Sequence, residues 1–163
     1  AERAAASLNE LADAIQHVAD TMSRSFTIVL AADLNTTLVQ DLAVMNNKAP
    51  MVNETTSLKD TLMVVTEKKL GVTLVSNAKR IVGIFTDGDL RRCLNNDIDL
   101  DKTTIKDVMT SNFKSIESNA LAIDAAEIME KNKIFSLVVN SSKNHGDSAG
   151  IITMHQLLEA GII

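Results

Sequence analysis

The sequence predicts an α/β (α+β) fold made of one small unit that occurs twice, and two observations lead to this prediction. Residues 83–92 read Gly-Ile-Phe-Thr-Asp-Gly-Asp-Leu-Arg-Arg, and residues 150–158 repeat them in degraded form as Gly-Ile-Ile-Thr-Met-His-Gln-Leu-Leu. Ahead of these copies, residues 58–65 and 121–128 share apolar positions at i, i+4 and i+7 and lie 63 residues apart, as in two equivalent helices. A short apolar strand that turns into a helix therefore closes each copy of a duplicated module.

Each copy of the unit is expected to have the order β-α-β-β-α. In the first copy, the predicted elements are a helical turn at 39–43, strands at 49–52, 72–75 and 81–86, and helices at 57–69 and 87–95. In the second copy, they are a turn at 105–109, strands at 114–116, 135–139 and 150–153, a helix capped by Asn119 that runs to residue 132, and a helix at 154–160. The polar stretch 96–104 is the predicted linker, and four extra residues lengthen the polar loop 140–148 of the second copy.

The segment ahead of the repeats has a different pattern. Leu8, Leu11, Ile15, Val18 and Met22 follow one another at spacings of three and four residues, which indicates an amphipathic helix within residues 1–24. Such a helix has an apolar stripe that needs a partner surface.

These patterns divide the chain into an N-terminal helix and connector at 1–38, a first repeat at 39–100 and a second repeat at 101–163. Each repeat has only about sixty residues, and a unit of that size buries too little surface to be very stable alone. The two repeats are therefore expected to pack together as one pseudo-two-fold domain.

Composition excludes several classes of protein. The 163 residues are 45% apolar and 23% charged, with a single proline, as in a globular domain. A net charge of −5 and the absence of Tyr and Trp argue against nucleic acid as a partner, because nucleic acids need a basic face and aromatic platforms. Cys93 is the only cysteine, and the longest purely apolar run, residues 28–32, is too short to span a bilayer. We therefore expect a cytoplasmic protein without a membrane segment.

The repeated motif supplies the candidate site residues. Thr86 stands three residues before Asp89 at a predicted helix start, where the pair is either a capping box or part of a ligand site, and on spacing alone capping is the simpler interpretation. A helix N-terminus next to a sheet edge also favours phosphate-bearing ligands. Arg91 and Arg92 either neutralise such a phosphate or form a solvated helix face. Lys114, ahead of the first strand of the second copy, either edges a cleft or is a surface residue, and a surface role is the simpler interpretation.

The second copy departs from the motif. Thr153 is followed by Gln156 where the first copy has the acid, and a glutamine still caps a helix but offers one neutral acceptor oxygen. The two clefts should therefore be unequal, with Thr153 and Gln156 mainly structural. His155 stands alone, and the three histidines show no spacing typical of metal ligands. No nucleophile and base constellation for catalysis is recognisable.

The tandem units, with Gly-Ile-Phe-Thr-Asp-Gly-Asp-Leu-Arg-Arg at 83–92, Asp-Val-Met-Thr at 107–110 and Gly-Ile-Ile-Thr-Met-His-Gln-Leu-Leu-Glu-Ala-Gly at 150–161, resemble a pair of cystathionine-β-synthase (CBS) domains. Within that family the pair is similar to the C-terminal pair of bacterial arabinose 5-phosphate isomerases. The resemblance covers about residues 39–163. It implies that catalysis belongs to a preceding sugar-isomerase domain, for which residues 1–38 are too short, so no enzymatic activity is expected of this chain.

The resemblance also implies a function for the clefts. Matching family positions place the hydroxyl of Thr86 and the carboxylate of Asp89 on a ribose, and His155 near the second cleft. A nucleotide or nucleotide-sugar effector is implied, such as a CMP-Kdo-like compound of the octulosonate (Kdo) branch of lipopolysaccharide synthesis. The resemblance implies the sugar-isomerase domain of the parent protein as a partner. The symmetric repeat and the amphipathic helix at 1–24 separately predict a homodimer or higher homo-oligomer, made by helix faces. The alternatives are a purely structural dimerisation module, a free-standing nucleotide sensor and, least supported by the residues, an independent enzyme.

Overall fold

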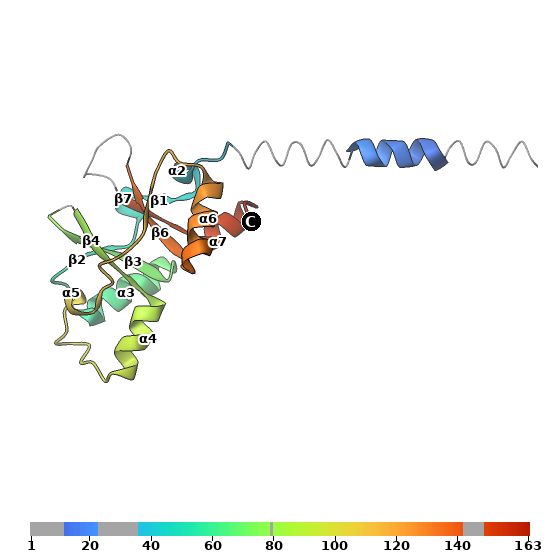
Figure 1. The fold of residues 1–163 in the computed structure, drawn as a ribbon. Coiled ribbons are helices and arrows are strands. Elements are labelled where there is room, and N and C mark those ends of the chain that lie inside the picture. Colours follow the sequence, from blue (N-terminus) through green and yellow to red (C-terminus); the bar gives the residue numbers. More distant parts are fainter. Residues whose placement is uncertain (1–11, 23–35, 79, 142–148) are drawn as a thin grey trace, which may run out of the picture. The chain divides into compact units, whose positions relative to one another are not determined.

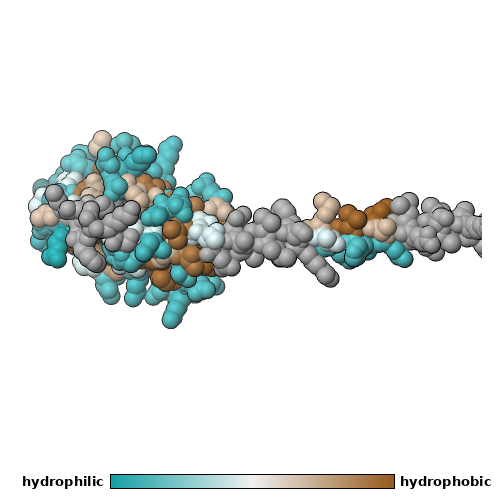
Figure 2. All heavy atoms as spheres, turned by 90° about the horizontal axis from the view of Figure 1, so that it is seen from above, coloured by the Kyte–Doolittle hydropathy of each residue, from teal (hydrophilic) through white to brown (hydrophobic). Residues whose placement is uncertain are grey.

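The computed structural model of the protein describes residues 12–22, 36–78, 80–141 and 149–163 (Figure 1). The chain divides into two units, Ala1–Thr36 and Thr37–Ile163. In the first unit, residues 12–22 form a helix with apolar side chains along one side and polar side chains along the other (Figure 2). The remainder of the predicted helix over 1–24 lies outside the described residues.

The first repeat has the predicted order of elements. It contains the strands β2 (Met51–Asn53), β3 (Val72–Asn77) and β4 (Arg80–Thr86) and the helices α3 (Leu58–Lys68) and α4 (Asp87–Asn95). The strands form a sheet in the order β2-β3-β4, in which β2 and β3 are parallel and β3 and β4 are antiparallel. The hydroxyl of Ser57 accepts a hydrogen bond from the Asp60 N–H, so the predicted cap starts α3.

The second repeat has the same order. It contains β5 (Ser115–Glu117), α6 (Ala122–Asn132), β6 (Ser136–Asn140), β7 (Ala149–Thr153) and α7 (Met154–Glu159). One predicted detail is wrong, because α6 begins after Leu121 and not at Asn119. Leu121 has no capping side chain, and the Ala122 N–H donates instead to the Thr37 carbonyl at 2.8 Å. Residues 142–148 of the predicted long loop lie outside the described residues.

The two repeats exchange short segments. β1 (Val44–Met45), which belongs to the first half of the sequence, pairs antiparallel with β7 of the second repeat, with Val44 opposite Ile151. In return, Thr110 of the second half forms a bridge with Ile84 on β4 of the first repeat. Figure 1 shows β1 next to β7. The sequence did not predict β1, because a strand of two residues carries no recognisable alternation.

The helical turns that open the repeats cross over in the same way. α2 (Val39–Leu42) begins where the Val39 N–H donates to the Ala120 carbonyl at 2.9 Å, and α5 (Ile105–Val108) begins where the Ile105 N–H donates to the Thr56 carbonyl at 2.8 Å. Ile105 is fully buried in a core with Leu58 and Phe85 of the first repeat. A second cluster of buried side chains joins the two sheets through Leu74 and Ile151. The predicted fold, two repeats packed as one pseudo-two-fold domain, is therefore confirmed.

The glycine that opens each copy of the motif lies under a segment from the other repeat. A Cβ on Gly83 would come within 2.9 Å of Met109 Cγ and 3.1 Å of the Thr110 carbonyl oxygen. A Cβ on Gly150 would come within 2.7 Å of the Val44 carbonyl oxygen and 3.2 Å of Met45 Cα. Real Cβ atoms essentially never come within 3.0 Å of backbone, so Gly150 is needed for β1 to pack on β7. At Gly83 the closest contact would be with the flexible side chain of Met109, which can partly give way.

Candidate ligand-binding cleft

A cavity of about 740 Å³ lies where the two repeats meet, a volume typical of small-molecule sites. The first repeat contributes the start of β3, the end of β4 and the first turns of α4. The second repeat contributes the segment between α5 and β5 and the turn from α6 into β6. The lining residues are Leu70, Gly71, Val72, Ile84, Thr86, Asp87, Gly88, Asp89, Arg91, Arg92, Thr110, Asn112, Phe113, Lys114, Asn132, Lys133, Ile134, Phe135 and Ser136.

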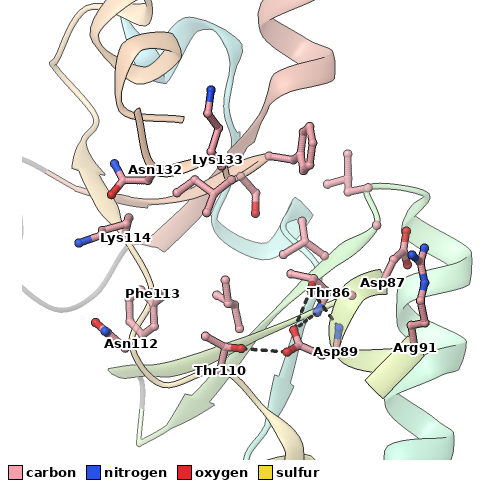
Figure 3. A pocket seen from close by; sticks show the side chains of 18 of the residues that line it. Thr86, Asp87, Asp89, Arg91, Thr110, Asn112, Phe113, Lys114, Asn132 and Lys133 are labelled. Atoms are coloured by element: carbon pink, nitrogen blue, oxygen red, sulfur yellow. Dashed lines mark hydrogen bonds between the residues drawn. The ribbon is translucent and has the colours of Figure 1, made fainter. Parts of the chain in front are cut away.

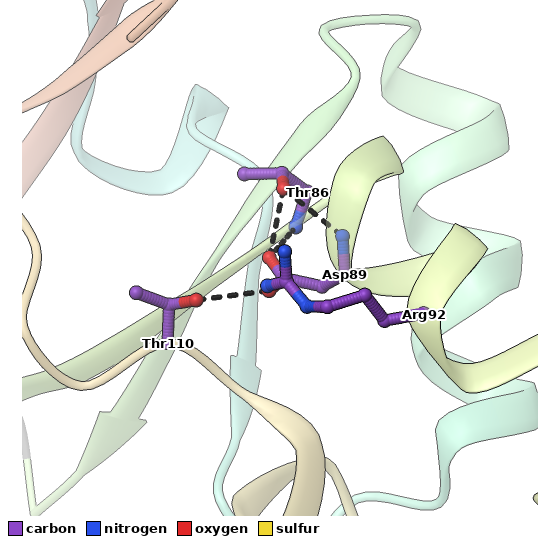
Figure 4. A network of polar contacts seen from close by, with 4 residues as sticks. All are labelled: Thr86, Asp89, Arg92 and Thr110. Atoms are coloured by element: carbon purple, nitrogen blue, oxygen red, sulfur yellow. Dashed lines mark hydrogen bonds and ion pairs between the residues drawn. The ribbon is translucent and has the colours of Figure 1, made fainter. Parts of the chain in front are cut away.

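Asp89 is the centre of a polar cluster at one end of the cavity (Figure 4). One carboxylate oxygen, Oδ2, accepts from the Thr86 N–H at 2.7 Å and from the Thr86 hydroxyl at 2.8 Å. The other, Oδ1, accepts from the Thr110 hydroxyl at 2.8 Å and from the Arg92 guanidinium. The Asp89 side chain is 1% exposed. A buried carboxylate with four donors caps α4 and at the same time ties the first repeat to the exchanged segment of the second.

Cys93, one turn after Asp89 on α4, is buried. Burial is the largest cause that raises the pKa of the Cys93 thiol, and the negative charge of Asp89 raises it further. The positive charge of Arg92 opposes this shift. The thiol therefore stays protonated at neutral pH and packs with Phe85 and Leu58 in the core of the first repeat.

The remaining wall of the cavity combines cations with aromatic surface (Figure 3). Lys114 and Lys133, both exposed, belong to the second repeat, and the structure gives neither an ion-pair partner within the described residues. Phe113 packs partly against the core between the sheets, whereas Phe135 is 76% exposed. An exposed phenylalanine that lines a cavity suits a flat, apolar part of a ligand.

The first motif thus contributes all of its predicted site residues to one cavity. Thr86, Asp89, Arg91 and Arg92 line it. The structure adds Asp87, Phe113, Lys133 and Phe135, which sequence reasoning did not select. Lys114, interpreted above as a surface residue, also lines it. Lys133 ends α6 in the left-handed conformation (φ 53°), so the turn into β6 brings its neighbours to the cavity edge.

The second motif lies elsewhere and forms a cap. Gln156 Oε1 accepts from the Thr153 N–H at 2.7 Å, and Gln156 Nε2 donates to the Leu42 carbonyl at 3.0 Å. His155 is exposed and lies 3.1 Å from a Glu159 carboxylate oxygen. None of these three predicted residues lines the cavity described above. Within the described residues, no group of three His, Cys, Asp or Glu side chains is placed to hold a metal ion.

Comparison with known proteins agrees with this architecture. The CBS domain family matches residues 39–96 and 105–162. The chain belongs to the CBS domain family. This confirms the resemblance inferred from the motifs. The two matched ranges leave out residues 97–104, which are all but the first residue of the predicted linker at 96–104.

One curated relative is the arabinose 5-phosphate isomerase of Pseudomonas aeruginosa, which is 42% identical over 126 residues, or 77% of this CBS chain and 38% of the relative. The chain thus spans less than half the length of that relative. A CBS domain protein from Pyrobaculum aerophilum, solved in complex with AMP, has a TM-score of 0.65 at 20% identity and covers 74% of this chain and 89% of its own. CBSX2, also solved in complex with AMP, has a TM-score of 0.63 at 22% identity, and the match covers 77% of this chain and 96% of the CBSX2 chain.

Proposed function

We propose that this CBS pair is the regulatory, effector-binding part of an arabinose-5-phosphate-isomerase-like protein, with a nucleotide or nucleotide sugar as the effector. The observation that carries the proposal is the cavity between the repeats, where polar side chains at the start of α4 face aromatic and cationic side chains of the second repeat. Two CBS structures with AMP support the choice of ligand class. Catalysis would belong to a sugar-isomerase domain outside residues 37–163.

The charge of the cavity supports an anionic ligand. Arg91, Arg92, Lys114 and Lys133 line it together with two carboxylates, although the whole chain carries a net charge of −5. The local excess of cations concentrates anions at the cavity. In the parent protein, a nucleotide sugar such as a CMP-Kdo-like compound would act as a feedback signal, since binding that favours one arrangement of the two repeats shifts the equilibrium of any domain attached to them.

A thermal-shift screen tests the proposal. A nucleotide at about 100 times its dissociation constant is expected to stabilise the fold by roughly 2.7 kcal/mol, which at this size corresponds to an increase of about 5–10 °C in Tm. The screen includes AMP, ADP, CMP and CMP-sugars, with inorganic phosphate as a control. A purely structural dimerisation module predicts no ligand-dependent shift, so a flat result across all nucleotides would favour that alternative.

We further propose that the chain forms a homo-oligomer through the helix at 12–22. Ile15, Val18 and Met22 follow a spacing of three and four residues, and each is more than half exposed. An exposed apolar stripe of this kind is stabilised by packing against a second helix. Sedimentation velocity is expected to give a dimer at micromolar concentration, and Val18→Glu is expected to give a monomer. A monomer of about 18 kDa for the unmodified chain would contradict the proposal.

A further inference from the structure

The segment by which the chain enters the CBS pair, residues 37–45, packs on the second repeat although it belongs to the first half of the sequence. The Thr37 carbonyl accepts from the Ala122 N–H at 2.8 Å, and the Val39 N–H donates to the Ala120 carbonyl at 2.9 Å. Figure 1 shows α2, which lies within this entry segment, beside α6. In space, the entry segment is therefore part of the second repeat.

Helix α6 connects the entry segment to the cavity. Its first N–H, that of Ala122, bonds the entry segment, and at its other end Asn132 and Lys133 line the cavity. The turn that follows is fixed to the helix, because the Ile134 N–H donates to the Met129 carbonyl at 3.0 Å. A helix of 11 residues is about 16 Å long. The second-repeat wall of the cavity and the entry segment are thus the two ends of one element.

This helix is suited to move as one piece. Its buried side chains, Ala122, Ala125, Ala126 and Met129, recur along its whole length, and alanine and methionine are strong helix formers. A close-packed helix does not deform continuously, so a shift at one end is transmitted to the other.

A second connection runs through α7. The first N–H of this helix, that of Met154, donates at 2.9 Å to the carbonyl of Phe135, a residue of the cavity wall. One turn later, Gln156 Nε2 donates to the Leu42 carbonyl of the entry segment at 3.0 Å. Two helices of the second repeat therefore join the same wall to the same segment.

The counterpart of α6 in the first repeat leads elsewhere. Helix α3 also ends next to the cavity, at Leu70 and Gly71. Its first N–H, that of Leu58, donates to the Thr103 carbonyl at 2.8 Å, which belongs to the linker between the repeats. The same construction there connects the cavity to the interior of the pair and not to the residues that precede it.

We propose that the second repeat is the output half of the pair, and that α6 transmits effector binding from the cavity to the entry segment and so to any domain that precedes residue 37. This inference rests on the proposed function, because it requires an effector in the cavity. An effector that contacts both walls favours one spacing of the two repeats. The coupling is reciprocal, so the contact between α6 and the entry segment must strengthen effector binding by the factor by which the effector strengthens that contact.

Ala122→Pro breaks the connection at a distance from the cavity. Proline is favoured at the first position of a helix, and it lacks the N–H that bonds the Thr37 carbonyl. The preceding residue, Leu121, has φ −72° and ψ 144°, a conformation that proline allows in its predecessor. Ala122 lies outside the cavity lining. Ala122→Gly keeps the N–H and is the matched control.

The test measures hydrogen exchange at the Val39 and Gln40 amides, which donate to carbonyls of the second repeat, together with AMP affinity by isothermal titration calorimetry. Couplings between sites are typically about 5–150-fold. AMP is expected to slow exchange at these amides by at least about fivefold in the unmodified chain and in Ala122→Gly, and inorganic phosphate at the same concentration should slow it less. In Ala122→Pro, AMP should no longer slow exchange, and its affinity should fall by the factor lost.

The outcomes separate the inference from the function on which it rests. If AMP binds but leaves exchange at Val39 and Gln40 unchanged, or if Ala122→Pro keeps the full slowing and the full affinity, the inference is wrong and the proposed function stands. If Ala122→Gly loses the coupling as Ala122→Pro does, the hydrogen bond to Thr37 is not the connection and the inference is also wrong. If no nucleotide binds the unmodified chain, the proposed function fails and the inference fails with it.

A second variant covers the case in which Ala122→Pro does not fold. Val39→Pro removes the N–H that bonds the Ala120 carbonyl, on the other side of the same junction. Val39 is the first residue of α2 and follows Leu38, which is extended with φ −91° and ψ 153°, so proline suits this position too. The Gln40 amide remains for the exchange measurement, and the same loss of slowing and of AMP affinity is expected.

Discussion

Gly150→Ala is expected to destabilise the CBS pair by about 3 kcal/mol, at the upper end of what an overpacked core position costs. The added Cβ would lie 2.7 Å from the Val44 carbonyl oxygen and 3.2 Å from Met45 Cα, and neither backbone atom can move without separating β1 from β7. The pairing of β1 with β7, which is one of the two exchanges between the repeats, would therefore be weakened. Urea unfolding followed by circular dichroism measures the loss.

The equivalent substitution in the first repeat is a graded control. At Gly83 the shortest contacts would be with the flexible side chain of Met109, so Gly83→Ala should cost less, about 1–2 kcal/mol. Combining it with Met109→Ala should cost less than the sum of the two single changes, because both act on the same contact. Met45→Ala should not rescue Gly150→Ala in this way, since the backbone of Val44 remains. Equal costs at both glycines, or rescue by Met45→Ala, would contradict this explanation.

The fold could be predicted from the sequence because its signals are local and occur twice. The Thr86 and Thr153 capping boxes, each followed three residues later by an acid or amide, form as expected. Helix α4 has the predicted bounds, Asp87–Asn95. The predicted cap at Asn119 is wrong, because a hydrogen bond to a distant segment replaces the expected side-chain cap at the start of α6. A tertiary contact of this kind leaves no trace in neighbouring residues.

The exchange of segments could not be predicted for the same reason. β1 is defined by its pairing with β7, which is more than a hundred residues away, and only the register of the folded chain reveals it. The two glycines were visible in the motif, but the segments that pack on them were not. Their physical role depends on Val44 and Met109, which lie over the strands only in the folded chain.

The sequence predicted the wall of the candidate site that the first repeat supplies, but not the opposite wall. The motif placed Thr86, Asp89 and Arg91 together because they lie within one turn of helix and its cap. The opposite wall comes from the second repeat, and Phe113 and Phe135 reach it only through the pseudo-two-fold packing. Sequence alone also cannot distinguish Asp87 from Asp89, since one is exposed and the other is buried although they are two residues apart in the same motif.

Asp89→Ala is expected to destabilise the protein by about 2–4 kcal/mol, more than the loss of any other charged side chain in the lining of the cavity. The change removes the acceptor of the Thr86 N–H, the Thr86 hydroxyl and the Thr110 hydroxyl, and hydrogen bonds to a buried charge are each worth more than neutral ones. The N-cap of α4, Thr86, remains in this variant, so only the Asp89 half of the capping box is lost. Chemical unfolding at constant pH measures the loss.

Three variants decide whether burial and charge cause the effect. Gln156→Ala removes a neutral acceptor at the equivalent position of the second repeat, so it should cost only about 1–2 kcal/mol. Arg92→Ala should cost less than about 1 kcal/mol, because the Arg92 side chain is 67% exposed and its ion pair is screened by water. Asp87→Ala, in the same first turn of α4 but exposed, should change stability by about 0.5 kcal/mol or less. If Asp87→Ala costs as much as Asp89→Ala, the stabilisation comes from negative charge at the helix start and not from the buried hydrogen bonds that join the two repeats.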